Sequence, residues 1–81
     1  MEQISIRDRN HAAYLVTLGF QGDFVPQAGG IIEAVFEYSP ELESATRSFM
    51  ANAPIPVQSF VAASRFVSDR INQTRKAVSH D

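Results

Sequence analysis

The chain has no cysteine and no long apolar run, and each absence excludes a class of protein. Without cysteine, its 81 residues cannot form a disulfide, a thiolate nucleophile, or a cysteine-based zinc or iron–sulfur site. The longest apolar run falls far short of the about 20 residues that a membrane span needs. The opening residues, MEQISIRDRN, lack the apolar core of a signal peptide. We therefore expect a soluble, cytoplasmic protein with no membrane partner.

Length and charge limit what the chain can be. Its 81 residues are enough for one small domain, residues 1–81. A domain of this size buries only roughly 60–65% of its extended surface, so a partner would add stability. Residues 1–43 hold seven of the nine acidic side chains, whereas residues 44–78 hold five of the seven basic ones. Such an asymmetry can steer a charged partner, or the two halves can pack together and neutralise each other.

Residue patterning predicts a strand and a helix in the first part of the chain. QISIRD alternates, with Ile4 and Ile6 on one side, as a short half-buried strand does. The apolar residues of RNHAAYLVTLG recur at helical spacing, so we expect a helix over residues 9–18 with Asp8 as its N-cap. Gly19 can end this helix because glycine adopts the left-handed conformation without strain.

Two further strands are predicted on either side of a glycine-rich turn. FQGDFV can be extended, and we expect PQAGG to form the turn, with Pro26 ending the ladder of the strand. The next segment has the clearest alternation in the chain. Its apolar face is expected to consist of Ile32, Ala34, Phe36 and Tyr38.

Two helices are predicted to complete the chain. Ser39 is a suitable N-cap with Pro40 at the first helical position, so the acidic residues that follow it serve to start a helix. Its inward stripe is expected to consist of Leu42, Ala45, Thr46 and Phe49. The last helix should run from Val57 to about residue 76, with Arg65 and Asp69 as an i, i+4 ion pair. Residues 78–81 are expected to form a disordered tail.

These elements predict an α+β domain in the order β–α–β–β–α–α. We expect a small three-stranded, mainly antiparallel sheet covered by helices on one face, since a sheet this small needs helical cover. The core is expected to be built on Ile4, Ile6, Leu15, Phe36, Leu42, Phe49, Phe60, Val67 and Ile71.

No set of side chains predicts catalysis. His11 lacks a nucleophile to activate and a group to orient it, so we expect an exposed residue in the first turn of its helix. Glu33 and Glu37 share one strand face about 13 Å apart, farther than the carboxylate pairs of glycosidases, and are expected to face solvent. AGGII lacks the spacing of a phosphate-binding loop. The sequence therefore predicts a protein that is not an enzyme and uses no cofactor or metal.

The last predicted helix carries the candidate contact residues, Arg65, Phe66, Arg70, Arg75 and Lys76. Phe66 falls outside the apolar stripe, and an exposed aromatic beside arginine is a common interface anchor. The first hypothesis is a protein-interaction module that binds another protein or a second copy of itself, as a homodimer. The alternative is a nucleic-acid-binding accessory protein, in which the basic residues hold phosphates and Phe66 stacks on a base. A pI of about 5.6 favours the first hypothesis.

Three segments, in this order, resemble a family of small bacterial and phage-associated proteins of unknown function. They are HAAYLVTLGF, IIEAVFEYSPELESATRSFMAN and PVQSFVAASRFVSDRI. The family pattern is an AYLL-type helix closed by glycine, a VxFxFExSxEL strand-to-helix junction and a final helix with FxxAxRxL. The resemblance covers about residues 4–71, is tightest at the VFEYSPEL junction, and departs from the pattern at the longer FQGDFVPQAGG segment. It implies a fold and carries no activity.

Overall fold

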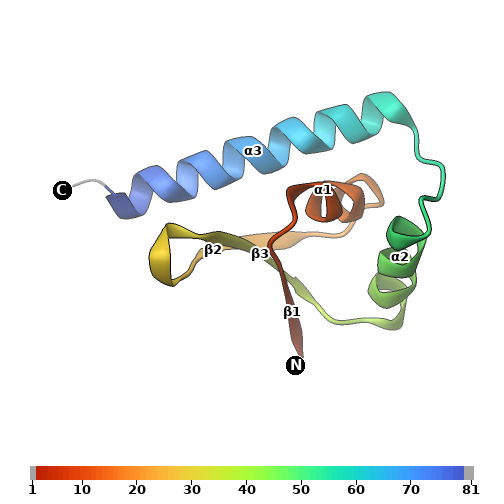
Figure 1. Ribbon diagram of the computed structural model, residues 1–81, viewed down its shortest axis with the longest axis horizontal. Coiled ribbons are helices and arrows are strands. Elements are labelled where there is room, and N and C mark those ends of the chain that lie inside the picture. Colours follow the sequence, from red (N-terminus) through yellow and green to blue (C-terminus); the bar gives the residue numbers. More distant parts are fainter. Residues whose placement is uncertain (1, 80–81) are drawn as a thin grey trace.

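The computed structural model describes residues 2–79, which form three antiparallel strands and three α-helices (Figure 1). The elements are β1 (Gln3–Ile6), α1 (Arg9–Thr17), β2 (Gly22–Pro26), a single 3₁₀ turn (Ala28–Gly30), β3 (Ile32–Glu37), α2 (Pro40–Met50) and α3 (Val57–Ser79). The predicted α+β class and the order of its strands and α-helices are confirmed.

The sheet has the order β1–β3–β2, so β3 is its central strand. Ile4 of β1 lies opposite Phe36, and Phe24 of β2 lies opposite Ala34. All of these side chains point to the side of the sheet that the helices cover, because residues that are directly opposite in an antiparallel pair share a face. The strong alternation of β3 thus reflects one buried and one open face in the middle of the sheet.

The ladder of β2 ends at Pro26, as we expected, although Pro26 itself is the last residue of the strand, opposite Ile32, and not part of the turn. The next residue, Gln27, donates its N–H to the carbonyl of Ile31 at 2.7 Å. Backbone N–H and C=O groups alternate in direction along a strand, so those of Val25 and Gln27 point toward β3. The nitrogen of Pro26 points away from β3, toward the free edge of β2. Its missing N–H therefore removes no hydrogen bond from the sheet.

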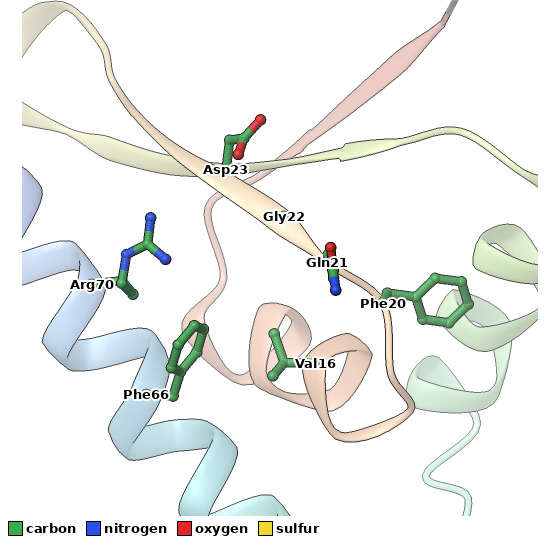
Figure 2. A pocket seen from close by; sticks show the side chains of 7 residues that line it. All are labelled: Val16, Phe20, Gln21, Gly22, Asp23, Phe66 and Arg70. Carbon is green, nitrogen blue, oxygen red and sulfur yellow. The ribbon is translucent and has the colours of Figure 1, made fainter.

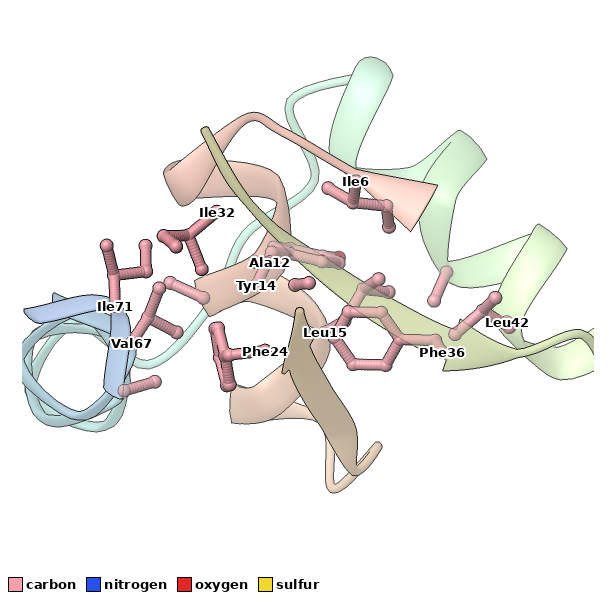
Figure 3. Close-up of a cluster of buried hydrophobic side chains, with 14 residues drawn as sticks. Ile6, Ala12, Tyr14, Leu15, Phe24, Ile32, Phe36, Leu42, Val67 and Ile71 are labelled. Atoms are coloured by element: carbon pink, nitrogen blue, oxygen red, sulfur yellow. The ribbon is translucent and has the colours of Figure 1, made fainter. Parts of the chain in front are cut away.

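The core lies between the sheet and the helices, and every strand and α-helix contributes to it (Figure 3). Six of the nine predicted core residues are buried, among them Phe36, Leu15 and Val67, while Ile4, Phe49 and Phe60 are partly buried and pack against the core. The buried set also includes five alanines, two further strand residues and one aromatic residue of α1, namely Ala12, Ala13, Ala34, Ala45, Ala63, Phe24, Ile32 and Tyr14. Tyr38, which we expected on the inner face of β3, follows the end of the strand and is exposed.

The predicted helix ends are present. Asp8 accepts hydrogen bonds from the N–H groups of Asn10 and His11, and Ser39 accepts one from Leu42 N–H at 3.0 Å. Gly19 has a φ of 98°, which a residue with a Cβ rarely adopts. Helix α3 is longer than expected and includes Val78 and Ser79, because no glycine or proline interrupts it after Pro56. The other residues of the expected tail, 80 and 81, lie outside the described residues.

Gly22 is the position in the sheet where a side chain does not fit. A Cβ on Gly22 would lie 2.9 Å from Cε2 and Cζ of the Phe36 ring, which is itself buried. We expect Gly22→Ala to lower the free energy of unfolding by about 1–3 kcal/mol, as overpacking a core does. Denaturant unfolding measures the change. Ser5→Ala, at an exposed strand position, serves as a control and should stay within about 0.5 kcal/mol of the wild type; an equal loss in both variants would contradict the prediction.

Candidate interaction surface on helix α3

Helix α3 separates the five predicted contact residues. Its buried line includes Val67 and Ile71. At about 100° of rotation per residue, Phe66 and Arg70 lie on one flank of that line and Arg75 on the other. Arg65 and Lys76 share the outward side of the helix, where both are exposed. The structure therefore brings Phe66 and Arg70 together and leaves the other three residues apart.

Phe66 and Arg70 form a cluster with Phe24, which comes from β2. The Phe24 and Phe66 rings meet edge to face, with centroids 6.5 Å apart and planes at 71°. The guanidinium carbon of Arg70 lies 5.3 Å from the Phe24 centroid and 5.7 Å from that of Phe66. Both distances are within the range of a cation–π contact. The sequence pattern did not pair Phe24 with α3, because its place opposite the helix depends on the tertiary packing.

A groove runs beside this cluster, between α3, α1 and the start of β2, and we call it the α3 groove (Figure 2). Its volume is about 540 Å³, and it is lined by Val16, Phe20, Gln21, Gly22, Asp23, Phe66 and Arg70. The guanidinium group of Arg70 points toward β2, whereas the Asp23 carboxylate points away from the groove (Figure 2). Asp23 does so because it alternates with Gly22 and Phe24, which face the helices.

Arg70 has no carboxylate partner among residues 2–79. The ion pairs in this part of the chain join Arg7 to Glu33 at 2.7 Å and Arg47 to Glu43 at 3.1 Å. The expected pair of Arg65 and Asp69 is not formed, since both side chains extend into solvent, where a single ion pair contributes little. The α3 groove therefore presents an unpaired positive charge beside a half-exposed aromatic ring, and Phe66 is 45% exposed.

Glu33 also differs from expectation. Its side chain is only 13% exposed because Arg7, the more exposed partner at 68%, lies over it. The pair spans the open face of the sheet from the end of β1 to β3. Glu37 is exposed on that face, as expected.

The side chains that line the α3 groove include no nucleophile with a base beside it. Within residues 2–79 there is also no group of three or more histidine, aspartate or glutamate side chains placed to hold a metal ion.

His11 is not the exposed residue that we expected but part of the contact between α1 and α2. Its Nε2 is 2.9 Å from Thr46 Oγ1, and its ring stacks on Phe49 with a centroid distance of 5.0 Å and an angle of 7°. Burial lowers the pKa of His11 below its ordinary value of 6.5, although the Asp8 carboxylate opposes this shift. The residue is a structural contact, because its nitrogen already has a hydroxyl partner.

The lowered pKa of His11 makes stability depend on pH in a defined direction. The folded state favours the neutral ring, so this contribution is complete above pH 6.5 and is lost as the pH falls below 6.5 through the folded-state pKa. We expect the wild type to lose more stability than His11→Gln over that window, because glutamine does not titrate. Denaturant unfolding at several pH values, with NMR titration of the His11 ring, measures both quantities. An equal pH dependence in the two proteins would contradict the assignment.

Comparison with known proteins does not assign the chain to a group. It matches no family model, and no significant match was found among curated proteins or among solved structures. The resemblance to small bacterial and phage-associated proteins therefore stays a prediction from the residues. None of the helices within residues 2–79 combines the length and the apolar character needed to cross a membrane.

Proposed function

We propose that the chain is a non-enzymatic, cytoplasmic protein-interaction module that uses the α3 groove to bind a partner protein. The partner segment presents a carboxylate to Arg70 and an apolar side chain to Phe66. Aromatic residues and arginine are the side chains most often found as energetic anchors in interfaces. The proposal also draws on the size of the chain, which is close to the lower limit for a self-sufficient core.

The observation that carries the proposal is the position of the Arg70 guanidinium. Two aromatic rings hold it within 5.3 and 5.7 Å, and it has no carboxylate partner within residues 2–79. A guanidinium that is already oriented loses less conformational entropy when it binds, so a bidentate bond to a carboxylate becomes more favourable. A half-exposed Phe66 beside it adds apolar surface that a partner can cover.

Nucleic-acid binding is the second candidate, because Arg70 beside Phe66 could hold a phosphate while the ring stacks on a base. The arrangement of the remaining cations argues against it. Arg65 and Lys76 face outward, and Arg75 lies on the opposite flank of α3, so the basic residues do not form one phosphate-binding stripe. Asp69 lies near the outward pair and reduces its positive potential further.

Selection of random peptides displayed on phage tests the proposed groove. We expect the enriched peptides to share an acidic residue next to an aromatic or aliphatic one, with affinities that Arg70→Met reduces about tenfold or more. Fluorescence polarisation of the labelled peptides measures those affinities. Arg75→Met is the matched control, since it removes the same charge from the same helix outside the groove, and it should leave binding unchanged. Enriched peptides without an acid, or equal losses in the two variants, would reject the groove.

Gel-shift assays with random-sequence DNA and RNA separate the two candidate functions. Phosphate-driven binding weakens steeply as salt rises, because it is driven by counterion release. We expect no salt-sensitive shift at micromolar protein. A shift that Arg70→Glu abolishes would favour the nucleic-acid function instead.

A further inference from the structure

The outer edge of β1 carries backbone groups that no other strand within residues 2–79 uses. Tyr38 donates its backbone N–H to the carbonyl of Glu2 at 2.9 Å, so the backbone groups of Glu2 point toward β3. The backbone N–H and C=O groups alternate in direction along an antiparallel strand. Those of Ile4 and Ile6 therefore also point toward β3, while those of Gln3 and Ser5 point outward, away from the sheet. The order β1–β3–β2 makes this side an edge of the sheet.

The other edge of the sheet is protected. Pro26 has no N–H to offer at the free edge of β2, and α3 packs against this strand. By contrast, β1 contains no proline and no charged residue between Gln3 and Ile6, and it extends away from α3 (Figure 1). β1 therefore is the edge that can accept another strand.

An apolar notch lies beside β1 on the helix side of the sheet. It has a volume of about 210 Å³ and is lined by Ile4, Tyr38, Leu42, Glu43 and Thr46. The polar groups of the notch already have partners: Tyr38 Oη donates to Glu43 Oε1 at 2.9 Å, the other Glu43 oxygen binds Arg47, and Thr46 Oγ1 binds His11. An apolar side chain is therefore the suitable occupant, and Ile4, which is only half-buried, lies at its rim.

We propose that two copies of the chain pair antiparallel through β1 and form one continuous six-stranded sheet about a two-fold axis. The inference rests on the proposed function, protein interaction, and names a second copy as a partner at a surface separate from the α3 groove. Isologous pairing of this kind is the commonest arrangement of homo-oligomers. Because Gln3–Ile6 carries no charge, like charges do not meet within the paired strands.

The direction of the backbone groups limits the register, because outward residues must lie opposite outward residues of the second copy. Pairing Gln3 with Ser5 of the second copy, and Ser5 with its Gln3, is the register that uses both outward residues of β1 in each copy, giving ~4 hydrogen bonds. Ile4 then meets Ile4 of the second copy on the axis, on the helix side, next to both notches. A shift by one residue would break this match and turn the isoleucines of the second copy to the open face.

A single cysteine tests this register, since the natural chain has none. Opposite residues in a non-hydrogen-bonded antiparallel pair have Cα atoms about 4.5 Å apart, within the range of a disulfide. We expect Ile4→Cys to form a disulfide-linked dimer under mild oxidation about tenfold faster than Val25→Cys, a half-buried position on the β2 edge. Gln3→Cys is the second control, because its equivalent on the second copy is displaced along the strand. Equal rates in all three variants would overturn the proposed register.

Sedimentation equilibrium tests the pairing itself. We expect the wild type to be a dimer whose dissociation constant rises about tenfold or more in Ser5→Pro, which removes an outward N–H and no hydrogen bond to β3. Ser5→Thr is the matched control and should remain a dimer, and circular dichroism shows whether each variant is folded. A monomer at ~1 mM, or a dimer unaffected by folded Ser5→Pro, would overturn the proposal. If Ser5→Pro does not fold, the rates of disulfide formation in the three cysteine variants decide whether the two copies pair through β1. Peptide binding in the α3 groove is independent of these variants, so the two proposals fail separately.

Discussion

The contact of the Phe36 ring with Gly22 is the constraint on which the arrangement of the site depends. Phe36 is 1% exposed in the central strand, and its ring occupies the space that a side chain at residue 22 would need. This close approach sets β2 beside β3 in the register that turns Phe24 toward the helices. Phe24 in turn contacts Phe66 and Arg70, so the orientation of the guanidinium on α3 depends on a packing contact made within the sheet.

Local features of the chain were predictable from the sequence, and long-range partners were not. The alternation of β3 is strong because the strand is central, and the caps at Asp8 and Ser39 follow from short side chains that accept backbone hydrogen bonds within the next turn. The strand order and the stacking of His11 on Phe49 join residues far apart in the chain, and no periodicity encodes them. Pro26 was expected in the turn, but it lies in β2, because its nitrogen faces the free edge of the strand and so removes no hydrogen bond from the sheet.

For the candidate site, too, local features were predictable from the sequence and long-range contacts were not. The helical pattern of α3 correctly placed Phe66 outside the buried line, and the helix distributes the five candidate contact residues over three of its sides. The groove itself was not predictable, since it needs Val16 of α1 and Gly22 of β2 beside α3. The charge asymmetry also has a structural outcome: the ion pairs within residues 2–79 do not involve α3, so its cations do not neutralise the acidic part of the chain through direct pairs.

The position of Pro26 has a consequence for the size of any assembly built by strand addition. A sheet with two accepting edges can add strands at both ends without limit, which is how fibrils grow. In this sheet, Pro26 withholds a donor at one edge and leaves the other edge able to accept. Growth is therefore one-sided, and joining two copies edge to edge uses up the accepting side of both. In such an assembly, Pro26 together with the packing of α3 against β2 would block the second edge, and the assembly would be finite.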